Sequence, residues 1–517
     1  MQQGSGAIVD ACGEIARRLL SASEPTAEDA RRIVRSVCAR RALERIPKKQ
    51  EILAAAGPEG YGRLHSILLK KPAKTGSGVA VVALMPMPYA CPHGRCTYCP
   101  GGVDSNTPNS YTGAEPAAQS AIRHGYDPVR QITTKVDQLV AYGHSPAKLE
   151  LVIVGGTFMF MPAPYREWFA KSCYDALNGA ASETLEAAQR LNERAAVRNV
   201  GFTVETKPDY CREDHVETML RYGVTRVEIG VQSLRERIYR TVNRGHTFGD
   251  VVESFRAARD AGLKIVAHMM PGLPTATPDD DKEDLARLFG DERLRPDMLK
   301  IYPCLVLRDT PLYEMYKAGE YKPYDTGTML DVLATAKAAF PEWVRVMRVQ
   351  REIPPADIVA GPRYGNLRQM VHKEMSRRRT RCDCIRCREP RGPPSGLERR
   401  RIDYAASGGH ENFISYVDRS GSIYGFIRLR MPGNGAGPEE GAALVRELHV
   451  YGRALGLGER GGIQHSGLGR RLLAEAEGAA RREHGAGRVL VTSAVGTREY
   501  YRASGYSLYG PYMAKTL

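Results

Sequence analysis

Three closely spaced cysteines offer chemistry in this chain of 517 residues. Cys91, Cys96 and Cys99 follow the spacing C-x4-C-x2-C in a loop with several glycines and prolines. Three thiolates in one loop can hold three irons of a 4Fe-4S cluster and leave the fourth iron without a protein ligand. A zinc ion is the alternative, with His93 as its fourth ligand. The spacing alone leaves the choice between the two metals open.

A second group of three cysteines lies much further along the chain, among many arginines. Cys382, Cys384 and Cys387 have the spacing C-x-C-x2-C. In a reducing compartment, three thiolates this close together favour a zinc site over a disulfide framework. Three free thiols in a basic linker are the alternative, although their proximity would make them prone to oxidation. The fourth zinc ligand stays open among His372, Cys304 and His410.

A glycine-rich segment near the C-terminus has the pattern of a pyrophosphate-binding turn. The motif Q/R-x-x-G-x-G/A opens a predicted helix and comprises Gln464, His465, Ser466, Gly467, Leu468 and Gly469. Backbone amides at a helix N-terminus bind phosphate groups. A predicted strand precedes the motif and contains Glu447, Leu448, His449 and Val450. A flexible loop that leads into a basic helix could have the same sequence.

The middle of the chain alternates short β-rich runs with helical stretches. The predicted strands are Val79–Leu84, Leu149–Val154, Asn199–Glu205, Arg226–Val231, Lys264–Met269 and Met298–Tyr302. Helical intervals such as 117–142, 209–222 and 248–261 separate them, and 175–198 is predicted to be an added surface helix. This alternation predicts a parallel sheet in a closed or partly closed TIM-like barrel. Gly155 and Gly156 follow the second strand, at the end where such barrels bind substrates.

The sequence predicts a further unit on each side of this barrel. A linker rich in glycine and proline occupies 391–396, and a smaller α/β unit follows it. Its predicted strands are 412–417, 422–429, 443–451 and 488–493, with a helix at 467–483. Before the barrel, residues 8–72 have apolar residues at helical spacing among arginines and lysines.

The formal net charge of +15 is unevenly distributed along the chain. Residues 31–75 hold twelve Lys or Arg against three acidic residues, and residues 363–402 hold thirteen against four. Two such blocks could neutralise several phosphates of one polyanion, so we expect a nucleic acid as partner. Solvated faces or disordered arms are the alternative for each block. With no run of about 18 uncharged apolar residues and no basic segment leading into an apolar one, we expect a cytoplasmic protein without membrane segments.

These motifs resemble two known classes of enzyme. The first cysteine triplet followed by Gly155 and Gly156 resembles the radical S-adenosylmethionine (SAM) superfamily, although its commonest spacing is C-x3-C-x2-C and its glycine motif often ends in Glu where this chain has Thr157. The glycine-rich turn followed by Tyr500 and Tyr501 resembles the GNAT acetyltransferases, which place a tyrosine near the thioester sulfur. One of the two tyrosines would then only pack its helix against the sheet.

Both signatures in one chain, joined by a basic cysteine-rich linker, resemble the catalytic subunit of Elongator, the tRNA uridine acetyltransferase family. The most specific stretches are 92–102, 205–209, 228–233 and 268–274. The resemblance implies an α/β protein with four parts: a basic helical tRNA-binding region (1–75), a radical SAM barrel (76–360), a basic zinc-binding linker (361–400) and a GNAT acetyltransferase domain (401–517).

The resemblance also implies a function, which is to install a carboxymethyl-type group at C5 of the wobble uridine of tRNA. Cys91, Cys96 and Cys99 would hold a 4Fe-4S cluster, and acetyl-CoA would be the co-substrate. Gly155, Gly156, Lys207 and Gln232 would lie near SAM, with Lys207 in a catalytic role. Residues 464–469 and 447–450 would bind CoA, and Tyr500 or Tyr501 would act near the thioester. The anticodon stem-loop of tRNA would be the partner, with a homodimer or accessory subunits as further assemblies.

Two other functions compete with this one. A protein lysine acetyltransferase could carry a radical SAM barrel that has become structural, and a tRNA-binding scaffold could have lost catalysis. The intact cysteine triplet and the two basic blocks argue against the first. The presence of both cofactor motifs argues against the second.

Overall fold

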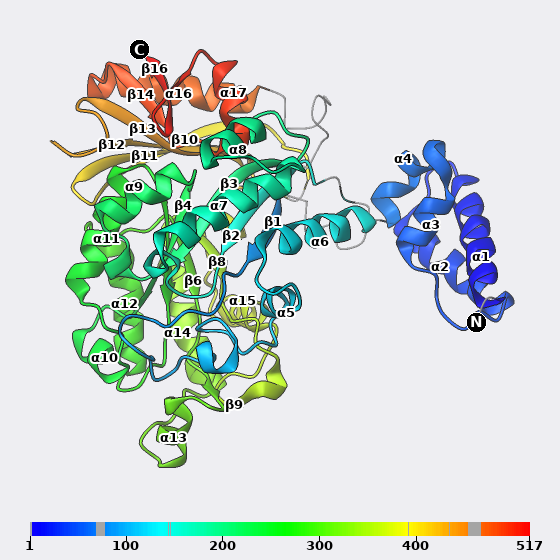
Figure 1. Ribbon diagram of the computed structural model, residues 1–517, viewed down its shortest axis with the longest axis horizontal. Helices are drawn as coiled ribbons and strands as arrows, with labels where there is room; N and C mark the ends of the chain where they lie inside the picture. Colours follow the sequence, from blue (N-terminus) through cyan, green and yellow to red (C-terminus); the bar gives the residue numbers. More distant parts are fainter. Residues whose placement is uncertain are drawn as a thin grey trace.

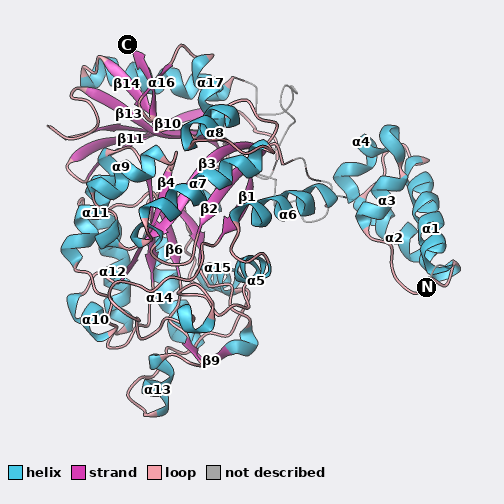
Figure 2. Cartoon of the chain, in the orientation of Figure 1, coloured by secondary structure: helices cyan, strands magenta, loops and turns pink. Residues whose placement is uncertain are grey.

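The structure is a computed structural model that describes residues 3–68, 78–142, 144, 146–390, 392–433, 435–452 and 467–517. Within these ranges, no helix is both long and apolar enough to span a membrane. Three units follow one another along the chain: a helical unit coloured blue in Figure 1, a sheet wrapped by helices, and a second sheet coloured orange to red. Figure 2 shows the strands gathered in the second and third units.

The helical unit consists of α1 (Gln3–Leu20), α2 (Ala27–Arg40), α3 (Lys49–Ala55) and α4 (Gly57–Leu68). Thr26 starts α2 with a capping box, in which its hydroxyl accepts the Asp29 N–H and the Asp29 carboxylate accepts the Thr26 N–H. Apolar residues at helical spacing, such as Ile15, Leu19 and Ile33, pack together in a core of their own. The prediction of a helical N-terminal region is confirmed.

The second unit is an open sheet of seven parallel strands in the order β1-β2-β3-β4-β5-β6-β8. The strands are β1 (Ala80–Leu84), β2 (Lys148–Ile153), β3 (Arg198–Thr206), β4 (Arg226–Gln232), β5 (Lys264–Met269), β6 (Met298–Ile301) and β8 (Arg345–Arg348). Because β1 and β8 do not pair, the curled sheet is a partial barrel, as predicted. The strand β8 is absent from the sequence-based prediction, since its four residues carry an arginine at each end.

Helices connect the barrel strands, and one more, α15, follows the last of them. They are α5 (Pro116–Arg123), α6 (Pro128–Ala141), α7 (Ala163–Asn178), α8 (Leu185–Asn192), α9 (Glu213–Arg221), α10 (Glu236–Thr241), α11 (Phe248–Asp260), α12 (Pro278–Gly290), α13 (Pro311–Lys317), α14 (Thr326–Ala339) and α15 (Leu367–Arg377). The interval 117–142 holds two helices because Asp127 caps a new helix that starts at Pro128. The surface helix expected over 175–198 is shorter, and α8 forms only its centre. Two short strands, β7 (Val306–Leu307) and β9 (Ile358–Ala360), pair separately.

The third unit is a mixed sheet in the order β10-β11-β12-β13-β14-β16-β15. Its elements are β10 (Glu398–Ala406), β11 (Gly409–Val417), β12 (Ile423–Met431), β13 (Ala442–Val450), α16 (Leu468–His484), β14 (Arg488–Val491), α17 (Arg498–Arg502), β15 (Ser507–Tyr509) and β16 (Tyr512–Thr516). The parallel pairing of β13 with β14 ends at Val445 and Val491, whereas β13 continues to Val450. Beyond Val445, no strand of the described residues pairs with this edge of β13, which we call the open edge.

The run of arginines at 399–401 belongs to this sheet and not to a linker. It lies in β10, where Arg399 pairs with Glu475 and Arg401 pairs with Glu483, both on α16. Each pair lies at the surface, with the arginine partly exposed. Part of the second basic block thus already has acidic partners within the fold.

The third unit covers the amino-terminal ends of the barrel strands. Arg446 on β13 donates to the Leu263 carbonyl, just before β5, and Arg428 on β12 donates to the Trp343 carbonyl, two residues before β8. Gly496 lies close to the backbone of Asn199 at the start of β3. The cysteine loop follows β1 and therefore lies at the opposite, carboxyl-terminal end of the barrel.

Buried ion pairs hold this contact together. Arg446 donates to both carboxylate oxygens of Asp297 at 2.6 and 2.8 Å and to Glu411 at 2.9 Å. Arg430 pairs with Asp260 at the end of α11, and all these groups are buried. A buried charge that loses its oppositely charged partner is strongly destabilising. These ion pairs therefore fix the third unit against the barrel.

Candidate active site

The first cysteine triplet lines a small cavity at the carboxyl-terminal end of the barrel. Besides Cys91, Cys96 and Cys99, the lining of this space of about 40 Å³ includes Gly156, Lys207 and Gln232. The structure therefore brings together the triplet and three of the four residues that sequence reasoning placed near SAM. Gly155 lies beside them and donates its N–H to Glu205 at 3.2 Å. Its φ of +121° and the approach of Pro108 leave no room for a side chain there.

Each sulfur of the first triplet has a hydrogen-bond donor. The Asn109 side chain donates to Cys91 at 3.3 Å, and the Ser110 N–H donates to Cys99 at 3.1 Å. The buried Arg244 guanidinium lies 3.8 Å from the sulfur of Cys96. Burial raises the pKa of the Cys99 thiol to about 11, so an unligated thiol stays protonated. Donors and a cation around three sulfurs are suited to thiolates that bind a cluster.

Lys207 reaches this site through His93. The Lys207 Nζ lies 3.0 Å from the His93 Nδ1, and the His93 Nε2 lies 3.1 Å from the sulfur of Cys96. Asp209 accepts a hydrogen bond from Lys207 at 3.1 Å. Burial, with Lys207 and Arg244 next, lowers the pKa of His93 to about 3, so the imidazole is neutral. Lys207 is buried and is held between a histidine and a carboxylate at the edge of the cavity.

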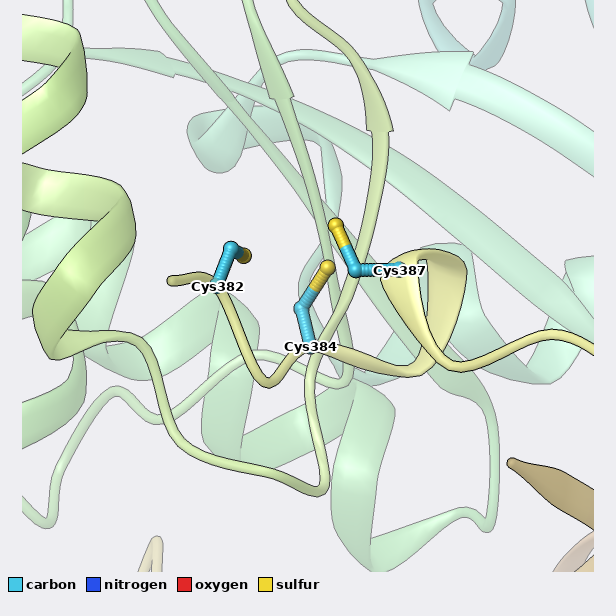
Figure 3. A group of neighbouring side chains, drawn as sticks. All are labelled: Cys382, Cys384 and Cys387. Carbon is cyan, nitrogen blue, oxygen red and sulfur yellow. The ribbon is translucent and has the colours of Figure 1, made fainter. Parts of the chain in front are cut away.

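The spacing of the sulfurs separates the two triplets. Two sulfurs that share one zinc ion at 2.3 Å lie no more than about 4.6 Å apart. Among the described residues, the one group of three metal-binding side chains with all ligand atoms within 4.8 Å of one another is Cys382, Cys384 and Cys387 (Figure 3). This second triplet has the spacing of a single-ion site, whereas the first is more widely spaced.

Two further side chains lie next to the second triplet. The His372 Nε2 is 3.8 Å from the sulfur of Cys387, which brings one of the three candidate fourth ligands to the site. The other two lie elsewhere: Cys304 packs in the apolar cluster near the first triplet, and His410 packs against His484. Lys337, fully buried on α14, donates to the sulfur of Cys382 at 3.3 Å. Sequence reasoning missed Lys337, because a lysine in a helix is normally a surface residue.

A larger cavity of about 570 Å³ runs through the barrel to the third unit. Its lining includes residues at the carboxyl ends of strands, at their amino ends and in the third unit: Gln232, Tyr302, Arg226, Lys264, Glu447, Leu448, His449 and Tyr501. Four residues line both cavities, namely Tyr98, Ser110, Glu205 and Gln232. The cysteine loop and the third unit thus face one continuous region inside the molecule.

Of the residues predicted to bind CoA, those that the structure describes lie on β13 (447–450) and at the start of α16 (467–469). Gly467 precedes α16 with a φ of +88°, and a side chain at Gly469 would meet the Tyr500 hydroxyl at 2.8 Å. Residues 464–466 of the predicted turn lie outside the described residues. Tyr501 is buried and lines the large cavity, whereas Tyr500 is 39% exposed. The Nε2 of His449 and the hydroxyl of Ser493, also in the cavity lining, are buried without a hydrogen-bond partner among the described residues.

Charged side chains inside the barrel form a second feature that sequence reasoning missed. Glu228, His268 and Lys300 come from the buried strands β4, β5 and β6 and line the large cavity. The available signal was a charged residue inside otherwise apolar strands, such as Lys300 in Met298–Ile301. In a barrel whose interior is packed, these positions hold branched apolar residues.

A partial barrel of parallel strands with a cysteine loop after its first strand defines a radical SAM protein. The Radical SAM superfamily model matches residues 85–288, the Radical_SAM C-terminal domain matches 296–377, and the ELP3 N-terminal domain matches 8–76. The chain is 44% identical over 489 residues to the tRNA uridine(34) acetyltransferase of Methanocaldococcus infernus, covering 91% of this chain and 92% of that protein. It is 42% identical over 527 residues to human Elongator complex protein 3, covering 98% and 96%.

A solved structure agrees with these similarities. The archaeal Methanocaldococcus infernus Elp3 with an N-terminal deletion superimposes with a TM-score of 0.75 at 39% identity, covering 85% of this chain and 100% of that one. The chain belongs to the family of Elongator complex protein 3 and the tRNA uridine(34) acetyltransferases.

Proposed function

We propose that this protein modifies the wobble uridine of tRNA, installing a carboxymethyl-type group at C5 by SAM radical chemistry with acetyl-CoA as co-substrate. The observation that carries the proposal is the pair of adjoining cavities: one lies among the three cysteines, and the other reaches from there to the open edge of β13. A radical made at one end and an acyl group held at the other can meet only if such a path exists. The names of the relatives, which specify tRNA uridine(34), support the choice of substrate.

Cys91, Cys96 and Cys99 would hold a 4Fe-4S cluster, and their donor-rich surroundings fit three thiolates. A bound cluster, reduced by an external electron donor, would supply the electron that cleaves SAM into methionine and a 5′-deoxyadenosyl radical. Gly156 leaves its backbone accessible at the cavity, and Lys207 and Gln232 add polar groups to it. Gln232 is in the left-handed region, with a φ of +73°, at the carboxyl end of β4. Such backbone strain at a non-glycine residue is typical of functional positions.

Acetyl-CoA would bind at the third unit. The amides at the start of α16 suit a pyrophosphate, and the edge of β13 beyond Val445, which has no strand partner among the described residues, would lie along an amide-containing arm. Of the two tyrosines, Tyr501 lines the cavity while the Tyr500 hydroxyl lies against Gly469. Tyr500 would therefore act near the start of α16, and Tyr501 would position it by packing.

A zinc ion would bind Cys382, Cys384, Cys387 and His372. The three sulfurs are close enough for one ion, and three thiolates with one imidazole form a common closed zinc site. The Ile385 N–H between the cysteines donates to the Val344 carbonyl, just before β8. Zinc at this position would fix the segment that joins the barrel to the third unit.

The experiment that tests the function combines tRNA, SAM, a reductant and acetyl-CoA with anaerobically reconstituted protein. We expect a modified wobble nucleoside by mass spectrometry, and we expect replacement of Cys91, Cys96 and Cys99 by Ala to abolish it together with SAM cleavage. Cys211→Ala, at a buried cysteine that belongs to neither triplet and contacts the Ser254 carbonyl, is the matched control and should retain the product. Efficient acetylation of free peptides without RNA, and no modified nucleoside, would instead favour the protein lysine acetyltransferase.

Binding of tRNA would use the basic blocks, because phosphate contacts set affinity and position. Neutralising Arg377, Arg378 and Arg379 should weaken the binding of all tRNAs alike and flatten its salt dependence. Arg377 and Arg378 already pair with Glu374, so Arg379, which is exposed, should contribute most. Iron content and CoA affinity should not change. Equal affinity of parent and variant across a salt series would refute a role for this block.

A further inference from the structure

The interior of the barrel is built as a binding site and not as a core. Side chains inside a TIM-like barrel are normally branched and apolar and fill the space in layers. Here Glu228, His268 and Lys300 occupy neighbouring inward positions on β4, β5 and β6 and line a cavity of about 570 Å³. A cavity of this size is typical of small-molecule sites. All three side chains are at least nine-tenths buried. Their polar groups therefore need hydrogen bonds from one another and from a ligand in the cavity.

Glu228 is the centre of this cluster, which we call the lumen triad (Glu228, His268 and Lys300). One of its oxygens, Oε2, accepts hydrogen bonds from His268 Nε2 at 2.8 Å and from Lys300 Nζ. The other, Oε1, is buried and has no hydrogen-bond partner among the described residues. Burial raises the pKa of Glu228, but Lys300 and His268 outweigh burial and hold it well below its ordinary value. The side chain is a carboxylate with one unused acceptor, which costs free energy unless a donor reaches it.

The surroundings of the lumen triad supply donors and flat apolar surfaces. Lys300 has three N–H groups, one of which is used by Glu228. Tyr98, Tyr111 and Tyr302 line the same cavity, and the ring of Tyr302 packs edge-on against His268 at 5.3 Å. Tyr98 also lines the cavity of the cysteine loop. A ligand bound here would have the Glu228 carboxylate and the Lys300 ammonium group in the wall of its cavity, aromatic rings around it and the cysteine loop next to it.

One class of ligand in the proposed reaction has the complementary groups. The imide edge of uracil presents an N–H between two carbonyl oxygens, so it needs an acceptor between donors. Cytosine presents an unprotonated ring nitrogen at the same place and would meet the carboxylate with a lone pair. Enzymes that act on a base take it out of its stack and read this edge with hydrogen bonds, between aromatic side chains.

We propose that the large cavity binds the extruded wobble base at its end next to the cysteine loop. Glu228 selects uracil there by accepting a hydrogen bond from its N3–H. The inference rests on the proposed function and adds the residue that sets base specificity. Lys300 and His268 position the carboxylate, and Lys300 offers a donor to a neighbouring carbonyl oxygen of the base. The base then lies beside Gln232, which the lumen shares with the cysteine-loop cavity.

The test measures the affinity of the full-length protein for fluorescent anticodon stem-loops that differ only at the wobble position. Uridine, cytidine and 3-methyluridine are compared, and a 3-methyluridine elsewhere in the loop is the control RNA. We expect the parent to bind the uridine stem-loop at least about tenfold more tightly than the other two wobble variants. This difference in affinity corresponds to the free energy of one hydrogen bond to a charged group. This comparison changes only the RNA, so it does not depend on the folding of a variant.

The protein variant Glu228→Gln complements the RNA series. An amide can donate a hydrogen bond to the ring nitrogen of cytosine. We therefore expect the preference for uridine over cytidine to fall to about threefold or less, because most of the free energy of one hydrogen bond to a charged group is lost. Glu150→Gln is the matched control, since Glu150 lies in the same cavity near its other end and pairs with Arg226; it should keep the preference.

The outcomes distinguish a failure of the base pocket from a failure of the proposed function. If the parent binds and modifies tRNA but shows equal affinity for uridine, cytidine and 3-methyluridine, the base pocket is wrong and the proposed function stands. The same conclusion follows if Glu228→Gln keeps the full preference. If the parent binds none of the stem-loops and modifies no tRNA, the proposed function and the base pocket both fail.

Discussion

Replacing Asp297 by Asn should destabilise the contact between the barrel and the third unit. Asp297 is fully buried and accepts two hydrogen bonds from Arg446 and one from the Ile265 N–H. The amide keeps the shape but removes the charge, which leaves Arg446 with Glu411 as its one remaining anionic partner among the described residues. Breaking a buried ion pair lowers the free energy of unfolding by about 3–5 kcal/mol. Because some hydrogen bonds survive in the Asn variant, we expect a loss of about 3 kcal/mol.

The assay is unfolding in urea, with tryptophan fluorescence as the readout. Trp343 is buried at this contact, stacked on Tyr404, and its carbonyl accepts from Arg428, so it reports on the loss of docking. With a urea dependence of about 3 kcal/mol per molar, a loss of about 3 kcal/mol lowers the midpoint by about 1 M. Glu314→Gln, which removes an exposed ion pair with Lys317 on α13, is the control and should leave the midpoint unchanged.

The pH dependence of Asp297 provides a second check. Burial raises its pKa, but Arg446 and Arg428 outweigh burial, so the folded-state pKa lies well below the ordinary value of about 3.9. The stabilisation is therefore complete above about pH 5 and is lost progressively as the pH falls below about 4. The difference between parent and variant should shrink over that range. An unchanged urea midpoint at pH 7, or an undiminished difference at pH 3, would contradict the role given to the network.

Three further predictions concern other buried groups. Lys337→Met removes the cation beside Cys382 and should lower zinc affinity about 10- to 100-fold in a chelator competition; equal zinc retention would refute the contact. Burial raises the pKa of Asp281 to about 7, which destabilises the folded state increasingly as the pH rises from about 4 to above 7. Asp281→Asn should accordingly unfold at higher urea than the parent at pH 8 and at equal urea at pH 4, and the reverse order would exclude this effect. Tyr501→Ala should cost about 3–5 kcal/mol of stability, whereas Tyr500→Ala should mainly weaken acetyl-CoA binding; similar unfolding midpoints for both would contradict the division of roles.

The barrel could be predicted from sequence because most of its strands are short runs of mainly apolar residues, separated by helical stretches. Val79–Leu84 and Lys264–Met269, for example, match β1 and β5 within one residue. Two of the strands that escaped prediction, β8 and β10, carry charges whose partners lie far away in the chain. Glu398–Ala406 contains three consecutive arginines, two of which pair with α16, and only the folded sheet shows why they are tolerated in a strand.

The two groups of cysteines could be found in the sequence because cysteine spacing is a local signal. The side chains around them could not. Lys337 reaches Cys382 from α14, and Arg244 reaches Cys96 from the segment between α10 and α11. The lumen triad depends in the same way on three strands that the sheet places side by side. Contacts between distant segments carry no periodic pattern, so sequence reasoning finds candidate ligands and misses their neighbours.

The cavity that runs from the barrel to the third unit gives the joining of these two units in one chain a meaning beyond proximity. A barrel whose interior is packed closes itself, but this one is hollow and lined with charges, and β13 with the segment after β14 covers its amino-terminal end. The third unit forms the floor of this cavity. Without it, the barrel would be a tube that is open to water at its base, and a radical formed within it would meet solvent before it met a substrate. Splitting the chain between residues 390 and 398 would therefore leave this cover dependent on the buried ion pairs between the two units.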